Sequence, residues 1–413
     1  MKNENARRDS SKSKQTLSDL AYFGGPPLFS EMLHVGRPNI GDRQSLHRRL
    51  DEILDRRWLT NNGPVVQEFE QRLADYLGVR HCITMANATI GLEIVIRALG
   101  LTGEVIVPSF TFIATAHALQ WQEITPVFCD IDPRTHTIDP AKIEQLITPR
   151  TTGIIGVHVW GRACDIEALE RIAQKHQLKL LFDAAHAFGS SYRGQRIGIF
   201  GDAEVFSFHA TKFFNTFEGG AVTTNDDELA GKIRLMKNFG FAGMDNVVYI
   251  GTNGKMNEMS AAMGLTSLES LDVFIETNRR NYLAYQRYLA GIPGIKLLTY
   301  DEAEDNNYQY IIIEVDEEAA GISRDQLTWL LHAERIRARR YFYPGCHQME
   351  PYRSYYPNAG LLLPETEALV TRVMSLPTGT AVDEADIQRI CQVIGFIVVH
   401  GPEISQRMAE EDR

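Results

Sequence analysis

A single lysine, Lys212, lies among aromatic and small residues in the stretch FSFHATKFFNTFEGG, which spans residues 206–220. Ser207 precedes it by five positions, and two glycines follow it closely. Lysine is usually a solvated surface residue, so the simplest interpretation is a loop lysine whose aliphatic stem packs on Phe213 and Phe214. Whether Lys212 instead does chemistry depends on which other residues would accompany it.

An acidic residue ends a strongly apolar run in LLFDAAHAFGS, at residues 180–190. Asp183 stands at the end of that run, small residues follow it, and His186 lies three positions further on. A buried carboxylate is costly unless it meets a cation or several hydrogen-bond donors. Asp183 is therefore either the partner of a cationic group or only the cap of a helix that begins after it.

Small residues in ANATIGLEI, at residues 86–94, predict a tight turn from a strand into a helix. The first residues of a helix expose backbone N–H groups, and a turn built from Ala88 and Thr89 would let a phosphate approach them. The alternative is an ordinary N-cap by Asn87 or Thr89.

Aromatic rings follow another predicted strand in PSFTFIATAHA, at residues 108–118. Phe110 and Phe112 stand where that strand should end, so one of these rings could cover a flat ligand there. Either ring could instead belong to the core, which is the usual place of an isolated aromatic side chain.

These four stretches together fit one ligand, a cofactor that carries a phosphate, a flat ring, a ring nitrogen to protonate and an aldehyde. Pyridoxal 5′-phosphate (PLP) has all four groups. Lys212 would hold it as a Schiff base, Asp183 would keep the pyridine nitrogen protonated, and Phe112 would cover one face of the ring. The phosphate would lie at the turn of residues 88–89, with help from the hydroxyl of Ser207.

Short apolar runs alternate with helical patterns through the first two thirds of the chain. Alternation at this pace predicts an α/β fold around a mainly parallel sheet. In such sheets ligands bind at the carboxyl ends of the strands, which is where the four stretches should meet. The expected strands are residues 81–85, 104–108, 125–131, 151–159, 178–183, 203–208 and 220–225, and the helices expected between them are 88–100, 109–121, 140–147 and 165–176.

The pattern changes after about residue 265. Residues 267–292 have the pattern of one long helix that connects two domains, and an apolar run at 308–315, a basic and aromatic run at 337–343 and a helix at 383–393 follow. These features predict a smaller α+β domain. The expected division is a disordered tail over residues 1–20, an N-terminal segment with the large domain over 21–265, and the connecting helix with the small domain over 266–413.

The composition argues against several function classes. The 42 Lys and Arg residues against 53 Asp and Glu residues give a net charge of −11, which disfavours a nucleic-acid-binding protein. Five scattered cysteines without CxxC spacing make a metal site unexpected and are typical of free thiols in the reducing cytoplasm. The N-terminus lacks the apolar core of a signal peptide, and no apolar run approaches the roughly 20 residues of a membrane helix.

Five motifs resemble those of the DegT-type sugar aminotransferase family, a branch of the fold-type I PLP enzymes. SFHATKFFNTFEGG (207–220) is similar to the family's lysine motif, and FDAAHAFG (182–189) is similar to its DAAHA or DAAQA motif. The other three are VPSFTFIATAHA (107–118), GTNGKMNEMSAAMGL (251–265) and RRYFYPGCH (339–347). They follow one another in the family's order, and the resemblance covers nearly all of residues 25–400.

The resemblance implies a fold-type I PLP-transferase that forms a homodimer with composite active sites. Lys212 would bind PLP and move protons, and His186 would lie near the O3′ atom of the cofactor ring. Asn253 would reach the phosphate of the neighbouring subunit. The remaining implied contacts are Asp183 to the pyridinium nitrogen, Phe112 to the ring face, Ala88, Thr89 and Ser207 to the phosphate, and His347, Trp58 and Asn61 to the substrate.

The activity that the resemblance implies is transfer of an amino group from glutamate to a keto-sugar nucleotide, either an NDP-4-keto-6-deoxysugar or a 3-keto relative. A cyclitol ketone is an alternative acceptor. A sugar dehydratase of the same fold would carry histidine in place of Lys212, and a PLP-binding regulator would normally add a DNA-binding module that this sequence does not show.

Two positions depart from the family pattern. Phe217 replaces the first glycine of the usual GEGG, and the phosphate turn reads NAT where SGT is common. Ala88 is still small enough for a phosphate to approach the backbone closely, so PLP binding is expected to survive both changes.

Overall fold

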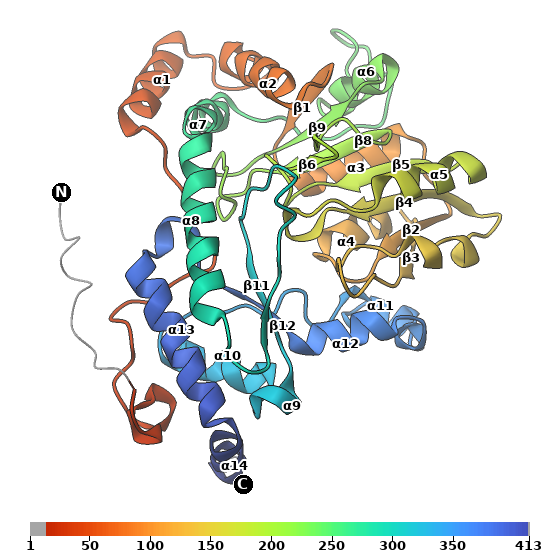
Figure 1. The fold of residues 1–413 in the computed structure, drawn as a ribbon. Helices are drawn as coiled ribbons and strands as arrows, with labels where there is room; N and C mark the ends of the chain where they lie inside the picture. The colour runs from red at the N-terminus through yellow and green to blue at the C-terminus, as the bar shows by residue number, and fades with distance from the viewer. Residues whose placement is uncertain (1–13, 412–413) are drawn as a thin grey trace.

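A seven-stranded sheet lies at the centre of the larger domain in the computed structural model, which describes residues 14–411 (Figure 1). The strand order is β1-β9-β8-β5-β4-β2-β3. β9 runs antiparallel to both of its neighbours, and the other neighbouring strands pair in parallel, which confirms the predicted α/β fold. The strands, each of them predicted, are β1 His81–Met85, β2 Glu104–Pro108, β3 Thr125–Cys129, β4 Thr151–Val157, β5 Lys179–Asp183, β8 Ala203–Ser207 and β9 Gly220–Thr224.

The strands are almost unbroken apolar runs because the sheet is covered on both faces. In β5, Leu181 packs into the core on one face, whereas its neighbour Phe182 packs into the core on the other. Alternate side chains of one strand therefore hold helices on opposite sides of the sheet. The helices are α3 (Ala88–Ala98), α4 (Ala114–Gln120) and α6 (Asp227–Met236) on the first face, and α2 (Pro64–Leu77) and α5 (Ile166–His176) on the second.

Three predicted helices differ from the structure. The helix expected over residues 109–121 begins only at Ala114, and residues 140–147 form two 3₁₀ turns instead of an α-helix. The single helix expected over residues 267–292 is wrong, because α7 (Glu258–Glu269) and α8 (Leu271–Leu289) meet at Ser270. α7 is buried against α1 (Arg43–Arg56) and α2, so the expected domain boundary after residue 265 falls inside a helix of the large domain.

The smaller domain contains a three-stranded antiparallel sheet with helices packed on it, as the α+β prediction requires. Residues 337–343 contribute only a single bridge to this sheet, between Arg339 and Ser375, and form no strand. The strands are β10 (Ile295–Leu297), β11 (Ile311–Val315) and β12 (Val373–Leu376), and the helices packed on them are α8, α9 (Glu317–Ala320), α10 (Arg324–Ala333), α13 (Glu384–Val399) and α14 (Gly401–Glu411). α12 (Pro364–Arg372) packs between the two domains, and α11 (Tyr352–Tyr355) packs on the core of the large domain.

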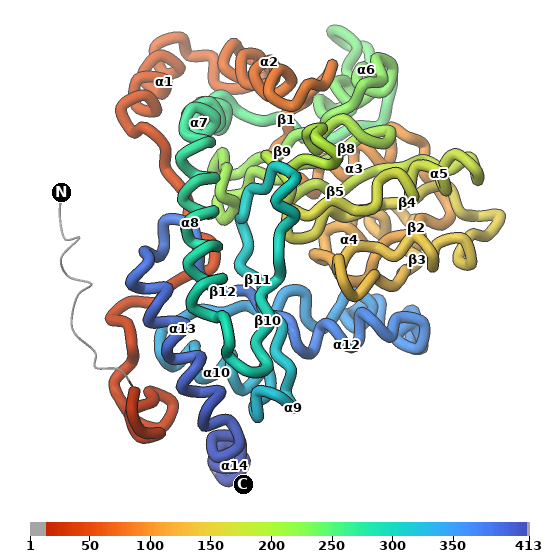
Figure 2. The backbone as a smooth tube through the Cα atoms, in the orientation of Figure 1, coloured from red at the N-terminus to blue at the C-terminus, as the bar shows by residue number. Residues whose placement is uncertain are grey.

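Residues 14–33 of the N-terminal segment pack on the small domain, although the segment was expected to associate with the large domain (Figure 2). Leu20, Leu28 and Leu33 are buried in one core with Leu330 of α10 and Ile336. A parallel bridge joins Leu33 to Ile336 and fixes the segment at that point. The apolar residues of the segment thus complete a core whose other members lie some three hundred positions away in the sequence.

The expected disordered tail is wrong for residues 14–20. Lys14 forms a buried ion pair with Glu334, with 2.9 Å between Nζ and the carboxylate oxygen, and residues 17–19 form a 3₁₀ turn. Residues 1–13 lie outside the part of the chain that the structure describes.

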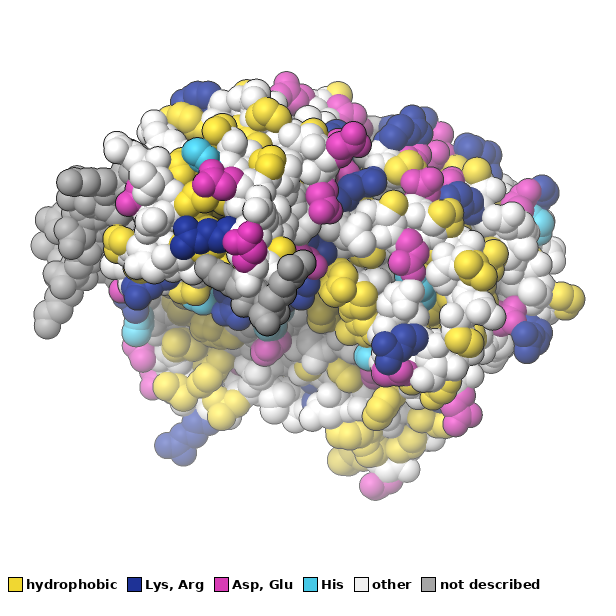
Figure 3. All heavy atoms as spheres, turned by 90° about the horizontal axis from the view of Figure 1, so that it is seen from below, with side chains coloured by type: hydrophobic (Ala, Val, Ile, Leu, Met, Phe, Trp, Pro, Cys, Tyr) yellow, Lys and Arg dark blue, Asp and Glu magenta, His cyan; other side chains and the backbone are white. Residues whose placement is uncertain are grey.

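The surface carries charges of both signs. On the face shown in Figure 3, basic and acidic side chains are interspersed with apolar ones. Among residues 14–411, no helix combines the length and the apolar character that crossing a membrane requires.

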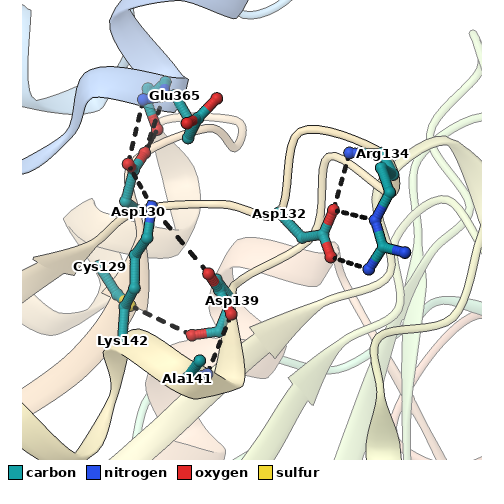
Figure 4. A network of polar contacts seen from close by, with 9 residues as sticks. Cys129, Asp130, Asp132, Arg134, Asp139, Ala141, Lys142 and Glu365 are labelled. Carbon is teal, nitrogen blue, oxygen red and sulfur yellow. Dashed lines mark hydrogen bonds and ion pairs between the residues drawn. The ribbon is translucent and has the colours of Figure 1, made fainter.

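Asp130, directly after β3, connects the large domain to α12 (Figure 4). Its carboxylate accepts hydrogen bonds from the backbone N–H groups of Glu365 (3.1 Å) and Thr366 (2.8 Å) and from the hydroxyl of Thr366 (2.8 Å). Lys142 adds an ion pair at 2.9 Å. Asp130 therefore caps the N-terminus of a helix from a distant part of the chain, where a negative charge is favourable.

Asp130→Ala should lower the free energy of unfolding at pH 7 by about 1–3 kcal/mol, because α12 loses its cap and Lys142 loses its partner. Burial disfavours the charge of Asp130, but the hydrogen bonds from Lys142 and Thr366 outweigh it and lower the carboxyl pKa. The contribution is therefore complete above the unfolded pKa of about 3.9 and is lost as the pH falls through the folded value.

Urea denaturation of wild type and of Asp130→Ala between pH 7 and pH 3 measures the contribution of Asp130 to the free energy of unfolding. The gap between wild type and Asp130→Ala should be full at pH 7 and should narrow below about pH 4. Asp132→Ala is the matched control, because Asp132 pairs with Arg134 inside one loop (Figure 4) and should cost about 1 kcal/mol or less. Equal losses for the two variants would contradict the capping role.

Candidate active site

The four stretches singled out in the sequence line one cavity of about 640 Å³ at the carboxyl ends of the parallel strands. Its walls come from the first turn of α3, the loop after β2, the end of β5, the end of β8 with the loop behind it, and two segments of the small domain. The predicted site residues in its lining are Ala88, Thr89, Phe112, Asp183, His186, Ser207 and Lys212.

Lys212 is half-buried in the loop after β8. Its Nζ donates a hydrogen bond to the hydroxyl of Tyr310 at 3.1 Å. Burial lowers the pKa of Lys212 to about 8, although the charge of Asp183 opposes this shift. A sizeable fraction of the amine is therefore uncharged near neutral pH, and the uncharged amine is the form that attacks a carbonyl group or accepts a proton.

Asp183 ends β5 with its carboxylate buried in the cavity wall. One carboxylate oxygen accepts a hydrogen bond from the hydroxyl of Thr115 at 2.8 Å, and the other accepts one from the N–H group of Ala185 at 3.1 Å. Burial raises the pKa of Asp183, and these two donors are neutral. The helix-cap interpretation is wrong, because turns and not a helix follow Asp183. A cationic N–H group on a ligand would give the carboxylate of Asp183 the charged partner that a buried carboxylate needs.

The surroundings of His186 determine both its tautomer and its charge. The backbone N–H of Trp160 donates to Nδ1 at 3.2 Å, so the ring proton lies on Nε2. Burial lowers the pKa of His186 well below its ordinary value, and the charge of Lys212 lowers it further. The ring lies within 18° of parallel to the rings of Trp160 and Phe342. His186 is thus a neutral hydrogen-bond donor on the cavity wall.

The N-terminus of α3 presents backbone N–H groups to the cavity. Asn87 caps the helix by accepting the N–H of Ile90, so the predicted cap is present. The N–H groups of Ala88 and Thr89 have no hydrogen-bond partner within residues 14–411. Gly220 packs so closely against this turn that a Cβ atom at this position would lie only 2.8 Å from the nitrogen of Ala88. Unpaired donors at a helix N-terminus form a site for an anion such as phosphate.

The two phenylalanines after β2 have different places. Phe112 is 54% exposed and lines the cavity, whereas Phe110 is fully buried against Trp160 and Phe342. Phe112 is therefore the ring that can cover a ligand.

Three predicted site residues lie on exposed segments outside this cavity. Asn253 lies on the segment between α6 and α7, where its backbone bridges to Asn238. Trp58 and Asn61 lie on the segment between α1 and α2, and the indole N–H of Trp58 donates to the carbonyl of Thr60. A single chain does not bring these three side chains to the cavity.

His347 does not line the cavity either. Its ring is buried, and each of its two nitrogens contacts another side chain. Nδ1 lies 2.6 Å from the hydroxyl of Ser109, and Nε2 lies 2.6 Å from a carboxylate oxygen of Glu367. In this structure His347 therefore connects the loop after β2 to α12, and its expected contact with the substrate stays a prediction.

The small domain supplies cavity residues that the motifs did not indicate as site residues: Tyr310, Arg339, Tyr341 and Phe342. Arg339, Tyr341 and Phe342 belong to the motif RRYFYPGCH (339–347), in which the resemblance implied a role for His347 alone. Its mixture of arginine and aromatic residues is the signal that could have identified it as part of a site. Tyr310 precedes β11 and carries no such signal.

The residues that line the cavity fit PLP. Among the residues that the structure describes, no cationic group donates a hydrogen bond to the buried carboxylate of Asp183, and no group accepts one from the N–H groups of Ala88 and Thr89. The pyridinium nitrogen and the phosphate of PLP would supply these two missing partners. Lys212, with its lowered pKa, would bind the aldehyde.

The model of the DegT/DnrJ/EryC1/StrS aminotransferase family matches residues 41–395. The protein belongs to this family. The match includes both domains and all the cavity residues described above, so the expectation drawn from the motifs is confirmed and the chain is an aminotransferase.

This aminotransferase is similar to a dTDP-4-amino-4,6-dideoxy-D-glucose transaminase from Shigella dysenteriae, at 40% identity over 78% of this chain and 87% of that protein. It is 37% identical to a GDP-perosamine synthase from Caulobacter vibrioides over 84% of this chain and 94% of that protein. A crystal structure of DesI in the presence of its TDP-sugar product matches with a TM-score of 0.92 and 51% identity, and the match covers 95% of this chain and all of that one.

Proposed function

We propose that this aminotransferase uses PLP to move an amino group from glutamate to a keto-sugar nucleotide, either an NDP-4-keto-6-deoxysugar or a 3-keto relative, in amino-sugar biosynthesis. The observation that carries the proposal is the cavity, which combines Lys212, the buried carboxylate of Asp183 and the unpaired N–H groups of α3. The relatives named above support the acceptor class. The five cysteines, all free thiols, support a cytoplasmic location.

Bound in this cavity, PLP would supply an electron sink that stabilises negative charge at the carbon that carries the amino group. Asp183 would hold the ring nitrogen protonated, because a buried carboxylate favours a cationic N–H next to it. His186 would donate a hydrogen bond from Nε2, and Phe112 would cover the ring. Ser207 and the first turn of α3 would bind the phosphate.

Lys212 would attach the cofactor and move protons to and from the substrate carbon in both halves of the reaction. Its pKa near 8 suits both directions at neutral pH, because neither protonation state is strongly disfavoured. The hydroxyl of Tyr310 holds the amine in place. Glutamate and the ketone would enter the same cavity in turn, which predicts ping-pong kinetics.

A panel of acceptors tests this proposal. The PLP-loaded protein is incubated with dTDP-, UDP- and GDP-linked 3-keto and 4-keto sugars and with a cyclitol ketone, using glutamate or glutamine as the donor. Formation of an amino sugar from a nucleotide-linked ketone, detected by mass spectrometry, is the expected result. Amination of the cyclitol alone would refute the nucleotide-sugar assignment, and dehydration without amino transfer would refute the transaminase reaction.

We also propose a homodimer in which each subunit completes the other's site. The segment between α6 and α7 exposes a group of large apolar side chains, of which Met244 is 95% exposed, and such a patch is typical of a protein interface. Asn253 follows this patch and lies outside its own cavity. A second copy that covers the patch would bring Asn253 to the neighbour's phosphate. The patch consists of Phe239, Phe241, Met244, Val247, Val248 and Ile250.

Mixing two inactive variants, Lys212→Ala and Asn253→Asp, should restore activity after subunit exchange. The aspartate would place a negative charge against the phosphate of the neighbouring site. In a mixed dimer one site receives both defects and the other receives neither, so each mixed dimer should recover one of its two sites. Steady-state rates before and after exchange measure the recovery. If both residues act within one chain, mixing restores nothing, and the cross-subunit role of Asn253 is excluded.

A further inference from the structure

A second cavity, of about 380 Å³, lies beside the first. This side cavity extends over α10 and over residues 337–343. A substrate too long for the first cavity could continue into it, because the two cavities have part of their wall in common. The residues that line both are Thr111, Phe112, Arg339, Tyr341 and Phe342.

The side cavity is basic although the protein is acidic. Its lining includes Arg337, Arg339, Arg340 and His332, and none of the described residues that line it is an aspartate or a glutamate. In the whole chain 53 acidic residues outnumber 42 basic ones, so the lining departs from the average composition. Positive charge gathered in a concave surface attracts anions more strongly than the same charge on an open surface.

The backbone holds two of these arginines in fixed positions. The N–H of Arg337 donates to the carbonyl of Leu33 at 2.9 Å, and the N–H of Arg339 donates to the carbonyl of Ser375 at 3.1 Å. The residue before each arginine is buried, so the alternation of this extended segment turns both arginines outward, where they line the side cavity. Residues two apart in an extended segment are separated by roughly 6–7 Å, a distance that two neighbouring phosphate groups can span.

Neither arginine is neutralised by a carboxylate within residues 14–411. The guanidinium carbon of Arg339 lies 4.2 Å from the centre of the Tyr341 ring, which fixes its orientation without cancelling its charge. Arg340, in contrast, pairs with Asp325 at 3.2 Å. Arg337 and Arg339 therefore remain able to form bidentate pairs with the oxygens of a phosphate or a carboxylate.

We infer that the side cavity binds the diphosphate of the nucleotide sugar, with Arg337 and Arg339 as its partners. The inference rests on the proposed function and extends it. Arg339 lines both cavities, whereas Arg337 lines only the side cavity. Arg339 therefore also binds a carboxylate of the amino donor when the donor occupies the first cavity, so it serves both substrates in turn. Arg337 serves only the nucleotide sugar.

Calorimetric titration of the PLP-loaded protein with dTDP, UDP and GDP tests the diphosphate site without turnover. For the nucleotide that binds tightest, Arg337→Gln and Arg339→Gln should each weaken binding by about tenfold or more, as the loss of a charge-assisted hydrogen bond implies. Arg280→Gln, which removes an exposed arginine from α8, is the control and should leave the affinity unchanged. Arg339→Lys keeps the charge without the bidentate geometry, so its affinity should lie between those of Arg339→Gln and wild type.

The titration overturns the inference if wild type binds none of the three nucleotides, or if both glutamine variants bind like wild type. The parent nucleoside lacks the phosphates that the arginines should recognise. If Arg337→Gln and Arg339→Gln weaken binding of the nucleoside as much as binding of the diphosphate, the inference is also overturned. A melting temperature equal to that of wild type shows that a variant is folded and excludes misfolding as the cause of a loss of affinity.

The amino donor separates the roles of the two arginines. Glutamate added alone should bleach the cofactor absorbance, and the glutamate concentration for half-maximal rate should rise at least several-fold more in Arg339→Gln than in Arg337→Gln. An equal rise in both variants would overturn the shared role of Arg339. Failure of wild type to react with glutamate, while nucleotides still bind through both arginines, would refute the proposed function and leave the side cavity as a nucleotide site.

Discussion

Lys212→Ala should abolish amino transfer by the PLP-loaded protein. In the proposed function the variant would lose the group that attaches the cofactor and moves the proton, and the proton transfer alone contributes on the order of 10²–10⁴-fold to the rate. Steady-state assays with glutamate and the accepted ketone measure the loss. Borohydride reduction followed by peptide mapping should find the cofactor on the peptide that contains Lys212 in wild type only.

A matched control distinguishes this effect from the loss of any lysine. Lys179→Ala removes an exposed lysine that pairs with Asp202 at 3.1 Å, and it should keep its turnover. The Lys212→Ala protein should still retain some cofactor, because Asp183 and the first turn of α3 do not depend on the lysine. A turnover near the wild-type rate in Lys212→Ala would refute the central role of this residue.

Asp183→Asn should lower the rate by roughly 100-fold or more, which corresponds to about 3 kcal/mol of transition-state stabilisation. Asparagine keeps the shape of the side chain and one acceptor for Thr115 or Ala185, but it cannot hold a pyridinium proton by its charge. The melting temperature should change little, because the variant removes a buried charge and leaves the packing intact. Rate assays and thermal melts of the loaded protein give the two quantities.

The opposite pattern would assign Asp183 to the structure of the domain. A small change in rate with a large drop in melting temperature would mean that its hydrogen bonds to Thr115 and Ala185 stabilise the end of β5 and have no catalytic role. In that case the partner for the ring nitrogen would have to be sought elsewhere in the cavity.

The large domain could be predicted well from the sequence because its signals are local. A strand such as β4 is buried on both faces and therefore stands out as an apolar run. The site residues that follow such strands, among them Asp183 and Ala88, are placed at the same edge of the sheet by the parallel topology alone. Because the strands were predicted correctly, the four stretches that follow them were also predicted to lie together, and they line one cavity.

The missed features depend on contacts between distant parts of the chain. The break at Ser270 does not interrupt the helical pattern, because it arises where α7 ends its packing in the large domain and α8 leaves towards the small one. Tyr310 reaches Lys212 only after the two domains are placed together. His347 carries a motif that suggests a site, but Ser109 and Glu367 engage its ring, and neither partner lies near it in the sequence.

The packing of the N-terminal segment on the small domain has a consequence for how the protein is made. Leu20, Leu28 and Leu33 leave the ribosome long before α10, their partner in the core. At about 5–20 residues per second, the roughly 300 intervening residues correspond to a delay of about 15–60 s. The seven strands of the large sheet all emerge within that interval and can fold as a unit first. Until α10 appears, the leucines form an exposed apolar segment that a chaperone can hold, so residues 20–33 are among the last parts to reach their native place.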